Sequence, residues 1–269
     1  MEWLRRTAAP LSEKVWKAID DTASAMFKQT VVARRIMDFD GPRGWNHVAS
    51  QLGTFTPAQT PVSTHKVRFS IPDVMLLTEI RADFTLSWAD IDIFERAGPT
   101  LEPRPIEEAA RDMALAEDSL AFFGSSGSPG FLKAHDTPRV ALTDWSVPGR
   151  VVADLLAAVQ KLDSLGVRGP YEAVLSPQHY YCYLRQTGEG GAYPAAKQLG
   201  IVIEKVYNSP VIDGAVLFST RGGDFLITIG GDFTVGYRWH DNTSVHLFCV
   251  ETIAPQLLTP EAVCLIRPD

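Results

Sequence analysis

Apolar residues recur at every third or fourth position in two segments, and this spacing predicts two long amphipathic helices. The first begins after Pro10, where the hydroxyl of Ser12 can cap it, and its apolar face is formed by Leu11, Val15, Ile19, Ala23 and Phe27. The second covers residues 106–123 and is followed by Gly124, a residue type that often ends helices. The first helix is expected to be an N-terminal arm that leads into a turn at residues 41–44.

Strand-like segments around residues 48–56 and 66–71 flank a stretch rich in Thr, Pro, Gln and Ser, which predicts a long hairpin. A hairpin of this length buries little against its own domain, so we expect it either to move freely or to pack on another subunit. The apolar stretch that follows, residues 75–94, is typical of strands.

From about residue 136 the pattern alternates between helices and strands, which predicts a separate α/β unit. Its expected elements are a helix at 149–165, a strand at 171–175, a helix at 177–186 and strands at 201–207 and 214–219. The last part of the chain consists of strand segments again, similar to the first half: 225–229, 233–239, 245–252 and 262–266. This order predicts one discontinuous domain with a second domain inserted into it.

The composition of the chain indicates its cellular compartment and excludes some classes of binding partner. The chain has 25 Lys and Arg against 32 Asp and Glu, a net charge of −7, which argues against a nucleic-acid partner. Its 45% apolar and 21% charged residues are typical of soluble globular proteins. The three cysteines cannot all pair, which favours a reducing, cytoplasmic compartment. The sequence shows neither a signal peptide nor a membrane-spanning segment, so we expect no membrane partner.

Candidate chemistry is sparse. Two His-x-x-Cys pairs, His179 with Cys182 and His246 with Cys249, contain zinc-ligand residue types but lie far apart in the sequence. A cysteine hydrolase that uses Cys182 beside His179 remains a hypothesis, although no nucleophile motif accompanies the pair. We therefore expect no catalytic residue, no metal site and no cofactor, and a protein that is not an enzyme.

Short motifs match one known family in order and spacing over nearly the whole chain. They include the opening Met1 to Arg6 and the segment Arg221 to Phe225, together with residues 9–11, 16–20, 33–38, 41–45, 84–86, 95–96, 117–118, 169–171 and 236–237. Through these motifs the chain resembles the family 1 encapsulin shell proteins, the linocin-like bacteriocin family. The resemblance implies an α+β fold, the major capsid fold of tailed phages, or Hong Kong 97 type.

The resemblance also implies a domain organisation and an assembly. The expected segments are an N-terminal arm helix with the start of the peripheral domain (1–47), an extended loop (48–76), the peripheral domain with its spine helix (77–135), an axial domain (136–224) and a return to the peripheral domain (225–269). About 60 copies would form one closed icosahedral nanocompartment. Shells that this chain resembles enclose dye-decolorising peroxidases or ferritin-like proteins, which bind the shell through a C-terminal targeting peptide of the cargo. The resemblance therefore implies a role in iron storage or oxidative-stress defence.

Matching positions imply two sites. The cargo-peptide pocket would be formed by Phe27, Val31, Arg34, Ile36, Asp38, Asp232, Phe233 and Val235. Arg34 and Asp38 would fix the backbone or termini of the peptide, or would instead pair with each other at a subunit contact. The fivefold pore loop would be Gly188, Glu189, Gly190, Gly191, Ala192 and Tyr193, with Glu189 repeated as a ring of negative charge. The alternative function is that of a viral or prophage capsid protein that packages DNA.

Overall fold

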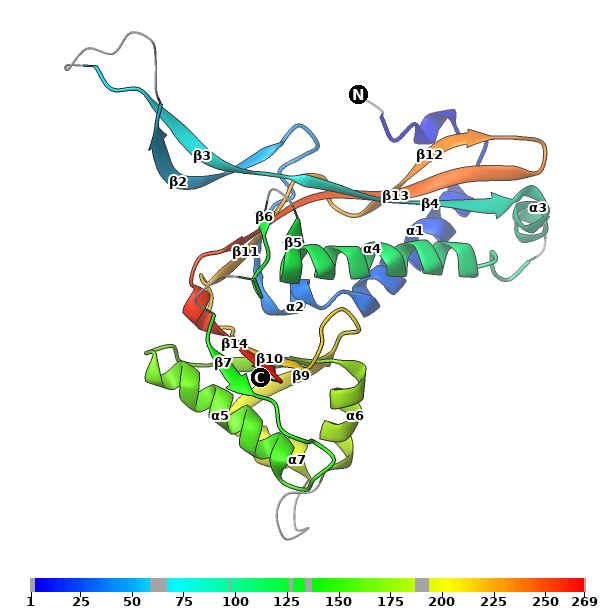
Figure 1. Cartoon of the computed structure of the whole chain (residues 1–269). Helices are drawn as coiled ribbons and strands as arrows, with labels where there is room; N and C mark the ends of the chain where they lie inside the picture. The colour runs from blue at the N-terminus through cyan, green and yellow to red at the C-terminus, as the bar shows by residue number, and fades with distance from the viewer. Residues whose placement is uncertain are drawn as a thin grey trace.

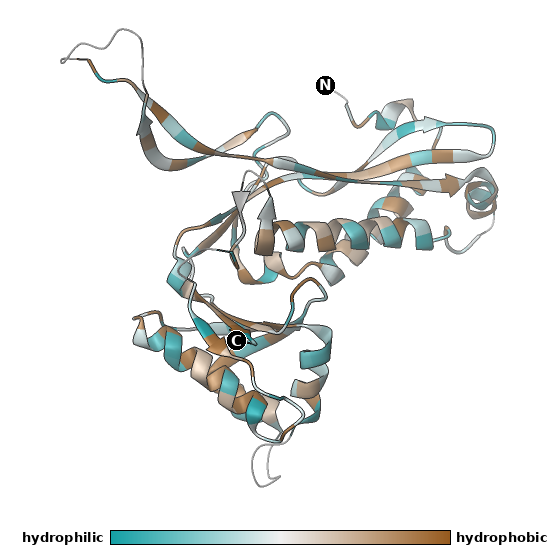
Figure 2. Cartoon of the chain, viewed as in Figure 1, coloured by the Kyte–Doolittle hydropathy of each residue, from teal (hydrophilic) through white to brown (hydrophobic). Residues whose placement is uncertain are grey.

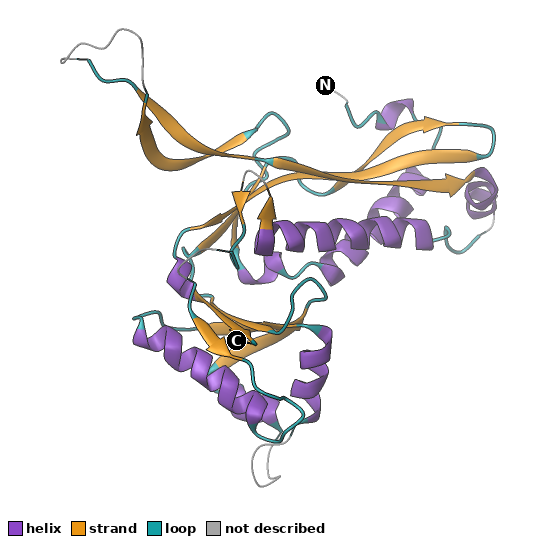
Figure 3. Cartoon of the chain, viewed as in Figure 1, coloured by secondary structure: helices purple, strands orange, loops and turns teal. Residues whose placement is uncertain are grey.

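The computed structural model describes residues 3–58, 67–96, 98–125, 128–133, 137–186 and 194–268. Within these residues the chain forms two bodies, each built on a five-stranded sheet, and a two-stranded ribbon that extends away from the first body (Figure 1). Figure 3 shows that helices lie against both sheets, whereas the ribbon has none beside it. The fold class is therefore α+β, as the sequence predicted.

The first sheet has the order β1-β11-β13-β12, and β4 pairs with the long central strand β13. Its strands are β1 (Asp38–Asp40), β4 (Thr78–Ser87), β11 (Phe225–Ile229), β12 (Thr234–His240) and β13 (Ser244–Leu257). All neighbouring strands are antiparallel except β1 and β11, which are parallel. Because β1 and β11 lie almost 190 residues apart, the sheet forms only when these two distant segments of the chain pair.

Both predicted amphipathic helices are present and lie on the same side of this sheet (Figure 1). They are α1 (Glu13–Thr30) and α4 (Arg104–Phe123), accompanied by the short η1 (Arg6–Ala8), α2 (Ala33–Ile36) and α3 (Trp88–Arg96). The hydroxyl of Ser12 accepts the N–H of Val15, which caps α1 as expected. The apolar faces of α1 and α4 form one buried cluster with the strands above them.

The ribbon consists of β2 (Ala49–Pro57) and β3 (Ser70–Leu76), which are antiparallel, so the predicted hairpin strands are confirmed. Several of its apolar side chains lie exposed. The strand-like interpretation of residues 75–94 is wrong beyond Ser87, because α3 begins at Trp88. The hydroxyl of Ser87 accepts the N–H of Ala89, and Ile91 and Phe94 are buried at helical spacing.

The second sheet has the order β7-β14-β10-β8-β9. Its strands are β7 (Arg139–Ala141), β8 (Tyr171–Leu175), β9 (Ile203–Asn208), β10 (Ala215–Ser219) and β14 (Val263–Arg267), and its helices are α5 (Arg150–Ser164), α6 (Pro177–Arg185) and α7 (Ala195–Leu199). Every residue of β8 and β10 is buried, as expected for central strands covered on both faces. Three short elements complete the chain: β5 (Gly124–Ser125), β6 (Ser128–Pro129) and η2 (Pro260–Ala262).

The end of the chain corrects the expected domain boundary. Residues 225–269 were expected to return to the first body, but β14 lies between β7 and β10 in the second sheet. Residues Val263 to Ile266 are buried, so this apolar strand suits a position that is covered on both faces. The last strand therefore ties the inserted body to the end of the chain.

Buried apolar side chains from the sheets and their helices form two clusters. Figure 2 shows hydrophobic residues, in brown, on the strands and helices of both bodies. One buried cluster joins the second sheet to the end of α4, to α2 and to β11, so the two bodies share a continuous core. Within the described residues, no helix combines the length and the apolar character needed to cross a membrane.

Candidate functional site

A groove with a volume of about 450 Å³ opens where the C-terminal half of α1 meets α2, β1 and the turn between β11 and β12. Phe27 of α1 and Phe233 of the turn form one wall, with their rings stacked at a centroid distance of 4.1 Å and an angle of 15°. Val31, which follows α1, is buried at its base. The groove is thus apolar, with charged side chains at its rim.

Five of the eight predicted pocket residues line this groove: Phe27, Val31, Arg34, Asp232 and Phe233. The other three lie elsewhere. Ile36 is buried in the core that joins the two bodies, and Val235 is buried in the core beneath the first sheet. The carboxylate of Asp38 accepts the backbone N–H of Gly223 at 2.6 Å.

The groove also contains residues that the sequence did not single out. Phe39 is 57% exposed, a large exposed area for an aromatic side chain, and lies on the same groove as Ile229, Pro42 and Lys28. Phe39 lies between Asp38 and Asp40 in the sequence. An apolar residue between two acidic ones is the only local feature that could have indicated its place in the groove. Ile229 comes from a strand distant in sequence and gave no signal.

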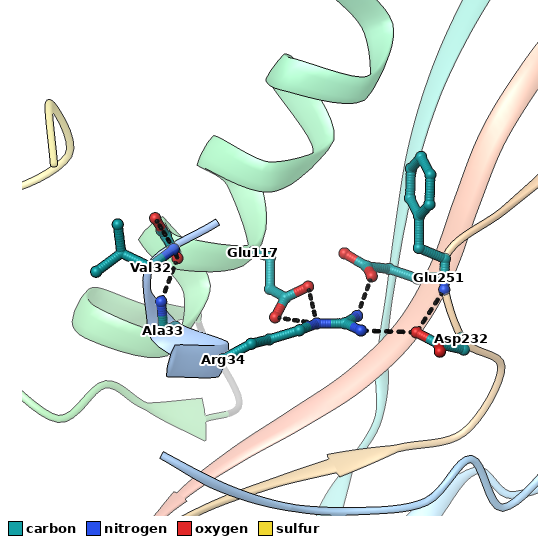
Figure 4. Close-up of polar contacts among 8 residues, drawn as sticks. Val32, Ala33, Arg34, Glu117, Asp232 and Glu251 are labelled. Carbon is teal, nitrogen blue, oxygen red and sulfur yellow. Dashed lines mark hydrogen bonds and ion pairs between the residues drawn. The ribbon is translucent and has the colours of Figure 1, made fainter. Parts of the chain in front are cut away.

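Arg34 is bound within the subunit by three carboxylates (Figure 4). Its Nε donates to Glu117 at 2.8 and 3.0 Å, its Nη1 to Asp232 at 2.7 Å, and its Nη2 to Glu251 at 2.8 Å. The side chains of Glu117 and Glu251 are completely buried. Among the described residues Arg34 therefore pairs with these acids and not with Asp38, and its three donor nitrogens are all engaged.

Burial and neighbouring charges shift the pKa values of Arg34 and Glu251. Burial disfavours the charged guanidinium, but Glu117 and Glu251 outweigh that effect and raise the pKa of Arg34. Burial, and then the neighbouring charge of Glu117, raise the pKa of Glu251 well above its usual value. Arg34 thus stays charged, while Glu251 tends to keep its proton.

Asp118, the neighbour of Glu117 on α4, places Arg34. Its carboxylate accepts the backbone N–H of Val32 at 3.0 Å and that of Ala33 at 2.7 Å (Figure 4). These are the first N–H groups of α2, which have no acceptor within their own helix. Burial raises the pKa of Asp118 to about 7, although the two N–H groups act in the opposite direction.

The structure does not bring the two His-x-x-Cys pairs together. His179 lies on α6, where its Nδ1 is 2.7 Å from the hydroxyl of Ser176, and burial lowers its pKa. His246 lies on β13 in the other sheet and stacks on Trp239 at 3.9 Å. Burial raises the pKa of the Cys249 thiol to about 12. In the described parts of the chain no three His, Cys, Asp or Glu side chains are grouped to hold a metal ion.

The pore-loop residues Gly188 to Tyr193 lie outside the described residues, so their role stays a prediction.

Residues 1–254 match the Linocin_M18 family, described as "Encapsulating protein for peroxidase". A type 1 encapsulin shell protein from Rhodospirillum rubrum is 36% identical over an alignment of 279 positions, which covers 99% of this chain and 97% of the relative. Another, from Mycobacterium tuberculosis, is 33% identical and covers 97% of this chain and 98% of the relative.

Solved structures show the same architecture. The virus-like particle from Pyrococcus furiosus has a TM-score of 0.70 at 12% identity and covers 94% of this chain and 99% of its own. The capsid of Myoviridae phage XM1 has a TM-score of 0.58 at 10% identity, with coverage of 85% and 88%. At such identities the likeness shows the fold alone, which is the major capsid fold of tailed phages.

Proposed function

The chain belongs to the type 1 encapsulin shell proteins, and we propose that the shell it forms encloses an enzyme that docks in the groove beside Phe39. The protein is thus a structural shell subunit and not an enzyme. The first body would be the peripheral domain and the second the axial domain, and about 60 copies would close one icosahedron.

The ribbon supports assembly through contacts between copies. On β2 and β3, Phe55 is 66% exposed, Ile71 60% and Leu76 65%. A two-stranded ribbon with these side chains in water is marginal by itself and gains stability when a neighbouring subunit covers it. In a closed symmetric assembly the ribbon of every copy would be covered by the same surface of a neighbouring copy.

Phe39 is the observation that carries the docking site. Its exposed ring lines the same groove as the half-buried Phe233, whose ring stacks on the buried Phe27, so two aromatic side chains offer apolar surface there. A short targeting peptide at the C-terminus of the cargo could bury aliphatic side chains there. Each nitrogen of Arg34 already binds a carboxylate of the same subunit, so apolar contacts would supply most of the affinity.

The family description names a peroxidase as the enclosed protein, and this favours a peroxidase as cargo here. A dye-decolorising peroxidase would link the shell to oxidative-stress defence, and a ferritin-like cargo would link it to iron storage. The alternative, a phage capsid that packages DNA, rests on fold likeness at 10–15% identity, whereas the relatives at 33–36% identity are encapsulin shells. The net charge of −7 also disfavours genome contact.

The test is cargo loading. The shell is co-expressed with a fluorescent protein that carries the C-terminal tail of a dye-decolorising peroxidase, and fluorescence is measured in purified particles. Phe39→Asp should leave the particles intact, because the side chain is exposed, and should abolish loading. Phe39→Leu keeps an apolar side chain and should load as the wild type does. Equal loading of Phe39→Asp and the wild type would overturn the docking site.

A further inference from the structure

Four charged side chains from distant parts of the sequence meet behind the groove, and we name them the charge cluster: Arg34 of α2, Glu117 of α4, Asp232 of the β11–β12 turn and Glu251 of β13. One guanidinium thus serves three carboxyl groups. Glu117 and Glu251 are fully buried, whereas the side chain of Asp232 is 48% exposed at the groove. The cluster therefore connects the interior of the first body to the surface where cargo would dock.

Asp232 links this cluster to the aromatic wall. Its Oδ1 accepts Nη1 of Arg34 at 2.7 Å and also the backbone N–H of Phe233 at 2.8 Å. The Phe233 ring stacks on Phe27, and the guanidinium carbon of Arg34 lies 4.9 Å from the centroid of the same Phe27 ring. The position of the wall thus depends on the bond between Arg34 and Asp232.

The buried carboxyl groups and Asp232 share the positive charge of Arg34, each through a different nitrogen. An ion pair in a buried, low-dielectric environment is attracted more strongly than one in contact with water. If both buried glutamates are ionised, they therefore pull the guanidinium inward and weaken its bond to the half-exposed Asp232. The proton of Glu251 decides between these two conditions, because a neutral carboxyl attracts the guanidinium far less than a carboxylate does.

The surroundings of Glu251 favour its neutral form. The charged groups that face it are Glu117 from α4, Arg34 from α2 and Asp232 from the turn, while β4 places the uncharged Ile80 opposite it. Cys249 is the titratable neighbour on its own strand. Oε1 of Glu251 is buried and receives no donor from the described residues, so a proton on this oxygen would relieve an unsolvated charge.

We propose that Glu117 and Glu251 are positioning residues of the groove, which they control through Arg34. With Glu251 neutral, Arg34 holds Asp232 and thereby the Phe233 wall. When Glu251 loses its proton, Arg34 is drawn to the two buried carboxylates and releases Asp232. Peptide docking then weakens. The inference rests on the proposed function, because it concerns the same groove.

The experiment measures the dissociation constant of a labelled peptide with the C-terminal sequence of the same peroxidase on assembled shells, from about pH 5 to about pH 9. We expect wild-type binding to weaken about three- to tenfold as the pH rises, the effect of losing one hydrogen bond. Glu251→Gln removes the proton equilibrium and should keep the tight, low-pH value throughout. Asp118 is present in both proteins, so its own titration cannot produce the difference.

Glu172→Gln is the matched control, because Glu172 is also buried and has one oxygen without a donor among the described residues, but lies in the second sheet. It should keep the wild-type pH profile. Asp232→Asn, at an exposed position, provides a second variant should Glu251→Gln fail to assemble. Its amide oxygen can still accept the Phe233 N–H, but it has no charge to be released, so its profile should be flat.

Two results would separate the proposals. If wild-type shells bind no peptide at any pH, the docking site itself is wrong and the inference falls with it. If the wild type binds with equal affinity across the pH range, or if Asp232→Asn or Glu251→Gln keeps the wild-type profile, the groove stands and the positioning role is refuted.

Discussion

Oδ1 of Asp118 on α4 accepts the backbone N–H of Ala33 at 2.7 Å, across 85 residues of sequence. This single carboxylate orients the first turn of α2 and so determines where Arg34 of that turn meets Glu117. Residues 117 and 118 thus act as a pair, one holding the backbone of α2 and the other its arginine side chain.

Asp118→Ala should therefore destabilise the shell subunit. The substitution leaves the N–H groups of Val32 and Ala33 buried without an acceptor, which costs about 1–3 kcal/mol. Asp118→Asn keeps one acceptor oxygen and should lose less. Urea denaturation followed by tryptophan fluorescence measures the difference, and equal stability of the alanine variant and the wild type would contradict it.

The raised pKa of Asp118 predicts how stability depends on pH. Its carboxyl has a pKa of about 7 in the folded chain against an ordinary 3.8, so between these values the folded chain keeps a proton that the unfolded chain has released. The resulting stability is complete below pH 3.8 and is lost as the pH rises through about 7. Melting temperatures should fall over this range.

Glu251 also makes the folded chain less stable as the pH rises, because its pKa is raised in the folded state as well. Asp118→Asn should therefore flatten the fall in melting temperature only partly, and the double variant with Glu251→Gln should flatten it further. Differential scanning calorimetry of purified shells at several pH values provides the measurement. Identical slopes for the wild type and the double variant would show that neither group holds the expected proton.

Arg34→Met should impair folding more strongly than the loss of a surface charge would. It leaves the buried carboxyl groups of Glu117 and Glu251 without their cation, which costs about 3–5 kcal/mol. Arg35→Met is the matched control, because Arg35 is exposed and donates to two backbone carbonyls. Particle yield compares them, and an equal yield would refute the structural role of Arg34.

The ribbon predicts a defect in assembly without a defect in folding. Leu76→Asp places a charge on an exposed apolar position that a neighbouring copy is expected to cover, so the particles should give way to small oligomers. The ribbon itself should survive, since Thr54 and Thr56 still donate to Asp73, each at 2.7 Å. Light scattering reports particle size and circular dichroism reports the fold.

Gln51→Asp is the control for this prediction, because it adds the same charge at an exposed polar position of the same ribbon. It should assemble normally. Intact particles from Leu76→Asp would show that this side chain lies outside any contact between copies.

Spacing along the sequence determined the elements whose cause is local. The repeat of Val15, Ile19, Ala23 and Phe27 after the capping Ser12 predicted α1, and the apolar face of residues 106–123 predicted α4. Strand-like segments on either side of a polar stretch predicted the ribbon. Each of these features follows from the period of a helix or strand, which neighbouring residues suffice to set.

Tertiary structure alone decided which distant segments meet. Trp88 to Arg96 has enough apolar residues for a strand, and the burial of Ile91 and Phe94 at helical spacing made it α3. The apolar segment Val263 to Ile266 fits a central strand of either sheet, and the vacant position between β7 and β10 determined its partners. The charge cluster joins Arg34 to acids 83, 198 and 217 residues away, and only the packing of α2 and α4 against the first sheet brings them into contact.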